Sequence, residues 1–136
     1  MLCAFERTVG LHIYKLCNFV KAISMKARFD ILLLKPARDF LMELDEKSRK
    51  KAFYILKKSS IQNDPRLFKK LNANIWEFRI RTLRGQIRML AFFDSRSGAL
   101  VVCTHGFIKK VSKVPLAELH RAENMRKQYF LENESI

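Results

Sequence analysis

The sequence predicts an α+β fold of order β-α-α-β-β-β-α, in which an antiparallel sheet is packed by an N-terminal helical hairpin and a C-terminal helix. Residues 75 to 94 alternate apolar and polar side chains, which is the period of a half-buried strand pair. Apolar residues after Pro36 and again after Pro115 recur at helical spacing. With 136 residues, 49% of them hydrophobic, the chain is long enough to bury one core.

The first strand and the helical hairpin lie close together in the sequence. The run from Phe29 to Leu34 predicts a strand, and Pro36 suits the first position of a helix. Two short apolar stripes then flank the polar insert DEKSRKK, so we expect the hairpin to break near Asp45. The stripes consist of Ala37, Phe40, Leu41 and Leu44 on one side, and of Ala52, Ile55 and Leu56 on the other.

Residues 1 to 24 precede this pattern and fit neither period. Glu6 and Arg7 stand where a signal peptide would have an uninterrupted positive region, so we expect no signal. We place the domain at residues 25 to 136 and treat residues 1 to 24 as an N-terminal extension of uncertain structure. An ordinary N-terminal helix and an over-long translation start are the open alternatives for this segment.

Three further strands and one helix complete the prediction. Asp64 and Pro65 open a turn and a basic loop, which strand 75–83 follows. Strand 86–94 comes after a turn at Arg84 and Gly85, and strand 99–105 comes after the turn SRSG. From Pro115 an amphipathic helix runs to the end, with Leu116, Leu119, Ala122, Met125 and Tyr129 on one stripe.

The polar side of the strand pair is almost purely basic. Strand side chains alternate between faces, so Glu77, Arg79 and Arg81 lie opposite the core side. Arg88 joins them if the hairpin is in register, because Ile87 and Met89 belong to the core. Between residues 66 and 88 seven basic residues accompany the single acid Glu77, namely Arg66, Lys69, Lys70, Arg79, Arg81, Arg84 and Arg88. A solvated charged face would mix signs, so this face predicts an anionic partner.

The last strand is followed by more cations. The segment CTHGFIKKVSKVP adds Lys109, Lys110 and Lys113 and places His105 at the strand end. Gly106 would allow a sharp turn or a close approach to a ligand. Cys103 and His105 supply only two metal ligands on one face, so we expect no metal site.

The whole chain carries 27 basic and 13 acidic residues, a net charge of +14. Such an excess implies a polyanionic partner, first of all nucleic acid. No run of about 18 apolar residues predicts a membrane span. The three cysteines are an odd number without a C-x-x-C pair, so neither a disulfide framework nor a zinc knuckle is indicated, and a reducing cytoplasm fits best.

The stretch LFKKLNANIWEFRIRTLRGQIRMLAFFD, followed by HGFIKKVSKVPLAELHRAENMRKQY, resembles the HigB branch of the RelE/ParE toxin superfamily, which includes phage-derived HigB-like toxins. The resemblance covers about residues 27 to 131 and rests on the paired elements KKL…WEFR…R and HGFxKK…P…E…A. It implies the RelE-like fold and the toxin of a type II toxin–antitoxin system. Such a toxin is a ribosome-dependent, metal-independent and cofactor-free mRNA endonuclease, or mRNA interferase, which acts in the ribosomal A site. Its partner would be a helix-turn-helix antitoxin.

RNA cleavage by the ribose 2′-OH needs a proton acceptor, a stabiliser of the phosphorane charge and a proton donor for the leaving oxygen. Arg79 and Arg88 match the strand arginines of the family and suit the charge, while His105 and Lys109 are candidates for proton transfer. Glu77 is an ion-pair partner for the arginines or, less simply, a base. We expect RNA contacts from Lys69, Lys70, Arg81, Arg84, Lys110 and Lys113.

Two other functions remain open at the level of the sequence. ParE-type members of the same superfamily inhibit gyrase and cut no RNA. A non-catalytic nucleic-acid-binding module would use the arginines for phosphate contacts alone.

Overall fold

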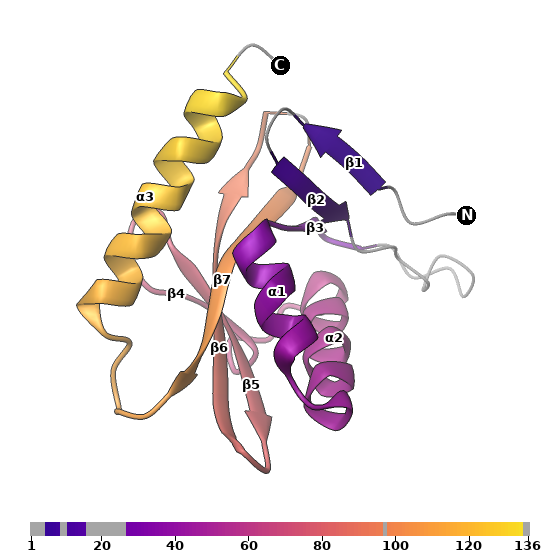
Figure 1. Cartoon of the computed structure of the whole chain (residues 1–136), viewed down its shortest axis with the longest axis vertical. Coiled ribbons are helices and arrows are strands. Elements are labelled where there is room, and N and C mark those ends of the chain that lie inside the picture. Colours follow the sequence, from indigo (N-terminus) through magenta and orange to yellow (C-terminus); the bar gives the residue numbers. More distant parts are fainter. Residues whose placement is uncertain (1–4, 9–10, 16–26, 97, 135–136) are drawn as a thin grey trace.

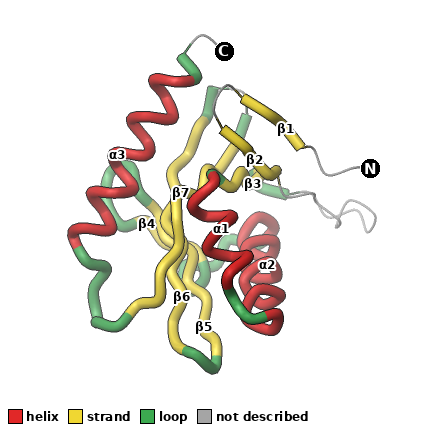
Figure 2. Tube along the Cα trace, viewed as in Figure 1, coloured by secondary structure: helices red, strands yellow, loops and turns green. Residues whose placement is uncertain are grey.

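The computed structural model describes residues 5–8, 11–15, 27–96 and 98–134, which form one mixed sheet with helices on both faces (Figures 1 and 2). The strand order is β1-β2-β3-β7-β6-β5-β4. The strands are β1 (Phe5–Thr8), β2 (Leu11–Lys15), β3 (Asp30–Leu33), β4 (Phe68–Lys70), β5 (Trp76–Thr82), β6 (Gly85–Asp94) and β7 (Leu100–Lys109). The helices are α1 (Lys35–Glu43), α2 (Glu46–Ile61) and α3 (Leu116–Glu132). The predicted α+β class and its helices are confirmed.

Each face of the sheet has its own hydrophobic core. The helical hairpin α1–α2 covers one face, where it packs on Phe78, Ile80 and Met89. Helix α3 covers part of the other face through Ala122 and Tyr129, which pack with Leu90, Phe92 and Val102. In Figure 1 the β5–β6 hairpin extends beyond the N-terminal turn of α3, so the far end of this second face lacks a helix above it.

The helical hairpin breaks where the sequence predicts. Pro36 lies in the first turn of α1, and Asp45 caps α2 by accepting a hydrogen bond from the backbone N–H of Ser48 at 3.0 Å. Because the cap satisfies an otherwise unpaired helix donor, the polar insert begins a second helix instead of extending the first.

The sheet differs from the predicted antiparallel one in two places. Strand β3 pairs with β7 in parallel, from Asp30 opposite Leu100 to Leu33 opposite Cys103, whereas β5, β6 and β7 form the predicted antiparallel meander. The predicted basic loop also contains a strand, because β4 pairs with β5 along one edge. Short strands of three residues give too weak an alternation to be read from the sequence.

The N-terminal residues add a strand pair to the sheet. Strand β1 pairs with β2, and β2 pairs with β3, both antiparallel. The alternative of an ordinary helix is therefore wrong for Phe5–Thr8 and Leu11–Lys15. The division between an extension and a domain at residue 25 stays a prediction.

Gly106 serves helix packing and not a turn or a ligand. It lies inside β7, which runs on to Lys109 and so is longer than the predicted strand 99–105. A Cβ atom at Gly106 would overlap the ring of Phe40 in α1. The glycine therefore lets α1 lie close against the centre of the sheet.

A β-bulge in β7 reverses the face of its C-terminal half. Leu90 of β6 pairs with His105, but Ala91 pairs with Cys103, so Thr104 is the extra residue. Cys103 then joins the core beneath α1 and α2, whereas His105 and Phe107 lie on the α3 side. The prediction that Cys103 and His105 share one face is wrong, because a bulge changes the alternation by one residue.

A polar cluster around the buried Asp94 joins the C-terminal end of α3 to the end of β6. Asp94 accepts hydrogen bonds from Arg96 at 2.8 and 2.9 Å and from the Tyr129 hydroxyl at 2.7 Å. Arg96 also donates to the backbone carbonyl of Asn133. The guanidinium of Arg96 is the main cause that lowers the pKa of Asp94 from 3.8 to about 2.

Among the described residues, no helix is long and apolar enough to cross a membrane.

We expect Asp94 to make stability depend on pH in the acid range. Since its pKa is lower in the folded chain, its contribution of about 2 kcal/mol is present above pH 4 and is lost as the pH falls through 2. Urea unfolding between pH 5 and pH 2 should show this loss in the wild type and much less of it in Asp94→Asn. Asp39→Asn is the control, because its ion pairs are exposed. Parallel curves for the wild type and Asp94→Asn would contradict the assignment.

Candidate nucleic-acid interface

Three rows of side chains cross β5, β6 and β7 on the α3 side of the sheet. Cross-strand partners share a face, so the register alone defines the rows. They are Glu77–Leu90–His105, Arg79–Arg88–Phe107 and Arg81–Gln86–Lys109, and Lys69 of β4 extends the first row beside Glu77. We call Lys69, Glu77, Arg79, Arg81, Arg88 and Lys109 the cationic face. The predicted joining of Arg88 to Arg79 and Arg81 is confirmed.

Glu77 and Arg88 form a buried ion pair at the centre of the cationic face. Arg88 Nε lies 3.1 Å from Glu77 Oε1, and each side chain is at most 5% exposed. Arg88 also donates to the Gln86 side chain at 2.5 Å and to the Ile87 carbonyl at 3.2 Å. Arg79 Nε lies 3.9 Å from Glu77 Oε2. Glu77 thus has the ion-pair position that the sequence predicts as one of its two roles.

Arg88 is buried, although the sequence places it opposite the core side together with Arg79 and Arg81. Its guanidinium contacts protein atoms, and the exposed fraction of its side chain is 3%, against 35% for Arg79. Arg79 and the exposed Arg81 therefore offer the accessible guanidinium groups. Arg88 lies opposite Arg79 on the neighbouring strand, and its positive charge is buried.

Lys109 is the titratable cation at the open end of this face. Burial is the first cause that lowers its pKa, and the positive charges of Arg88, Arg79 and Lys69 lower it further. A lysine with a lowered pKa holds a larger neutral fraction near pH 7 and so becomes better at accepting a proton.

His105 is held inside the molecule by two polar partners. Its Nε2 lies 2.9 Å from Glu118 Oε1 in the first turn of α3, and its Nδ1 lies 3.0 Å from the Thr104 hydroxyl. Burial lowers the pKa of His105, so the neutral ring donates from Nε2 to Glu118, while its Nδ1 lies beside the Thr104 hydroxyl, which also contacts the Leu90 carbonyl. With the ring 1% exposed, the arrangement suits positioning of α3 better than direct proton transfer to a ligand.

Only some of the other predicted RNA contacts lie on the cationic face. Lys69 lies on the cationic face, whereas Lys70 pairs with Trp76 on the opposite face, with its Nζ 6.0 Å from the indole ring. Arg84 at the β5–β6 turn lies 3.4 Å from Asp45 of the helical hairpin. Lys110 and Lys113 are exposed just after β7.

Two residues at this site escaped the sequence analysis. Gln86 fixes the orientation of Arg88, and Glu118 holds His105 from another element. Gln86 could have been predicted from the sequence, because period-two alternation places it on the same face as Arg88. Nothing local indicates Glu118, because its contact spans 13 residues and depends on how α3 docks.

Over the described part of the chain, no three His, Cys, Asp or Glu side chains come together to hold a metal ion.

We expect Arg88→Ala to destabilise the fold, contrary to what an exposed arginine would do. The substitution leaves the Glu77 carboxylate buried and unpaired, which typically costs about 3–5 kcal/mol. Urea unfolding should show this loss, and the double substitution Glu77→Leu with Arg88→Ala should recover part of it. Arg81→Ala, on the same face but exposed, is the control and should change stability by about 0.5 kcal/mol or less. A change below about 1 kcal/mol for Arg88→Ala would refute the structural role of the pair.

Comparison with known protein families shows the family to which the chain belongs. The family model of phage-derived Gp49-like proteins matches residues 39–127, a span that contains the whole cationic face and most of α3. No curated protein matches the chain. Since the model covers more than half of the sequence, the chain belongs to the phage-derived Gp49-like family, which is part of the RelE/HigB-like toxin superfamily.

Proposed function

We propose that the protein is a HigB-type toxin that cuts mRNA on the ribosome, with the cationic face as its active site. The observation that carries this proposal is the position of Lys109, a lysine with a lowered pKa in the same row as Arg81 and next to the row of Arg79 and Arg88. A proton acceptor beside several phosphate-binding groups is what cleavage by a 2′-OH needs.

The proposed reaction assigns a separate role to each group. Neutral Lys109 accepts the proton of the 2′-OH, whose oxygen attacks the adjacent phosphorus. The bond from phosphorus to the 5′-oxygen breaks, the 5′-oxygen takes a proton from water, and a 2′,3′-cyclic phosphate remains. Arg79 and Arg81 bind the phosphate oxygens, since a guanidinium matches two of them at once. Arg88, held by Glu77, keeps a fixed positive charge beneath the phosphorane and lowers the pKa of Lys109.

The partners follow from the family and the charge. Gp49-like proteins belong to a superfamily of toxins, which supports an antitoxin as the physiological inhibitor. We propose a helix-turn-helix antitoxin and, as substrate, mRNA in the ribosomal A site of the cytoplasm. The net charge of +14 favours association with ribosomal RNA through release of counterions.

A translation reaction with purified components tests the activity. Full-length protein added to translating ribosomes should cut the message, and mapping of the ends should place the cuts within the translated region. Intact message together with inhibited DNA supercoiling would favour a gyrase inhibitor instead.

Lys109→Arg separates catalysis from binding. The substitution keeps the positive charge but removes a group that loses its proton near neutral pH. We expect the cleavage rate to fall by about a hundredfold or more, with RNA affinity within about threefold of the wild type. The wild-type rate should rise with pH until Lys109 is neutral, and Lys109→Arg should lose this rise. Equal rates for both proteins would show that the face only binds RNA.

The adjacent lysines Lys69 and Lys70 form a matched pair, because they lie on opposite faces of β4. Lys69→Ala should weaken RNA binding and reduce the slope of log affinity against log salt by about one, whereas Lys70→Ala should change neither. Fluorescence anisotropy with a short single-stranded RNA at several salt concentrations measures both quantities. Equal losses for the two variants would mean that RNA does not bind to one face.

A further inference from the structure

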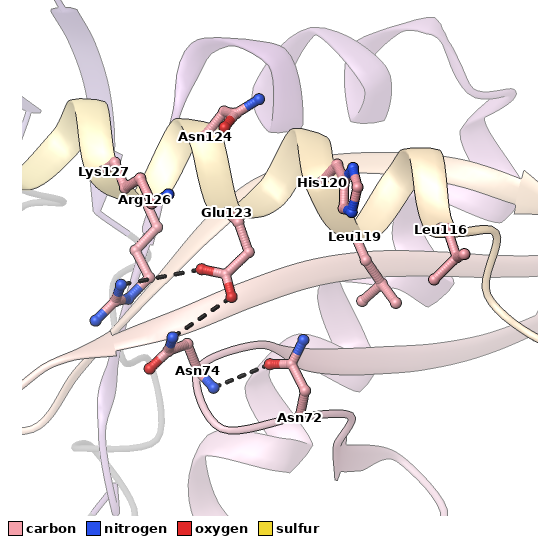
Figure 3. Close-up of a pocket in the computed structure, with 9 residues that line it drawn as sticks. All are labelled: Asn72, Asn74, Leu116, Leu119, His120, Glu123, Asn124, Arg126 and Lys127. Atoms are coloured by element: carbon pink, nitrogen blue, oxygen red, sulfur yellow. Dashed lines mark hydrogen bonds and ion pairs between the residues drawn. The ribbon is translucent and has the colours of Figure 1, made fainter.

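A groove of about 600 Å³ lies between α3 and the turn that links β4 to β5 (Figure 3). Its walls combine apolar and polar groups. Helix α3 contributes Leu116, Leu119 and Glu123, and the turn contributes Asn72 and Asn74. The Glu123 carboxylate points from α3 toward Asn74. The volume lies in the range of sites that hold small organic ligands. The proposed cleavage reaction does not use this groove.

Glu123 has an acceptor that no protein donor satisfies. Its Oε1 is buried without a hydrogen-bond partner, since Arg126 Nη1 is 3.9 Å away. Its Oε2 accepts only a long hydrogen bond of 3.4 Å from Asn74 Nδ2. A buried carboxylate oxygen without a donor is costly, so a ligand with N–H groups would bind here favourably.

Asn72 is fixed so that its donor faces the groove. Its Oδ1 accepts hydrogen bonds from the backbone N–H groups of Asn74 at 2.9 Å and Ile75 at 2.8 Å. The oxygen is therefore turned toward the backbone, and Figure 3 shows the amide nitrogen directed toward α3. The groove thus presents carboxylate acceptors and, across from them, one amide donor.

The groove adjoins the cationic face. Asn74 precedes Glu77 by three residues, which is about 10 Å along a strand, and a stacked nucleic-acid strand covers that distance in about three nucleotides. On α3, Leu116 is two residues from Glu118, which contacts His105 in the first row. Arg126 and Lys127 add positive charge at the groove itself.

We propose that this groove binds a guanine base of single-stranded RNA whose backbone continues onto the cationic face, a proposal that rests on RNA being the substrate. Guanine alone among the four bases has two adjacent N–H donors on its Watson–Crick edge, N1–H and the N2 amino group. These match the two oxygens of Glu123 once its carboxyl group rotates about the soft χ3 torsion and brings the buried Oε1 to the groove. The guanine O6 then accepts from the amide of Asn72. Leu116 and Leu119 supply apolar contacts for the face of the ring.

Binding of short RNAs that cannot be cut tests the groove apart from catalysis. The probes are 2′-O-methylated heptamers of uridine with guanine, inosine or no purine at the central position. Inosine differs from guanine only by the missing N2 amino group. With full-length protein, the guanine heptamer should bind about tenfold more tightly than the inosine heptamer in fluorescence anisotropy.

Glu123→Gln should reduce this preference to about one, measured as the ratio of the affinities of the variant for the guanine and inosine heptamers. Glu132→Gln, a substitution in the exposed last turn of the same helix, should retain the wild-type preference. Leu116→Ser should weaken binding of the guanine heptamer by several-fold, and since Leu116 is largely exposed the variant should fold normally. Thermal unfolding of each variant verifies that it is folded.

The outcomes separate the groove from the proposed function. Equal affinity of the wild type for guanine and inosine, or a preference that survives in Glu123→Gln, overturns guanine binding even if the protein cuts mRNA, and leaves a protein segment as the occupant. A guanine preference that Glu123→Gln removes, in a protein that cuts no message, supports the groove and refutes the catalytic role of the face.

Discussion

One extra residue in β7, Thr104, decides which side chains face the arginines of β5 and β6. Without the bulge, His105, Phe107 and Lys109 would point at the helical hairpin, and the cationic face would lack its lysine. The Thr104 hydroxyl also contacts Nδ1 of His105, so the bulged residue is itself part of the polar network. The same β7 therefore supplies core residues to α1 and α2 in its first half and site residues to the α3 side in its second half.

The charge distribution on this face reflects two opposing requirements. Binding an RNA phosphate favours several cations close together, whereas folding is opposed by their repulsion. The buried carboxylate of Glu77 reduces that repulsion, because its Oε1 lies 3.1 Å from Arg88 Nε and its Oε2 lies 3.9 Å from Arg79 Nε. The anionic partner in the proposed function would neutralise the remaining outward charges. On this view Arg88 acts through its buried charge, and the accessible Arg79, Arg81 and Lys109 contact the substrate.

Helix α3 links the separate parts of the second face. Its C-terminal end is held by Asp94 and Arg96, while Glu118 in its first turn holds His105. Between these two anchors the helix covers Leu90, Phe92 and Val102 and lines the groove beside the β4–β5 turn. A single docked helix thus sets where the open cationic face begins and how wide the groove beside it is. In the proposed function this arrangement gives a single RNA strand one continuous path across the groove and the cationic face.

The sequence by itself determined the elements and the sign of the surface. Proline and an acidic cap define the starts of the helices, period-two alternation defines β5 and β6, and the basic excess on one side of the hairpin indicates an anionic partner. These signals are local, so they act before the chain is packed. The tertiary structure alone decided the parallel pairing of β3 with β7, the bulge at Thr104, the burial of Arg88 against Glu77 and the contact of Glu118 with His105. Each of these depends on which distant segment lies alongside, and burial and strand register carry no signature in the local pattern of residues.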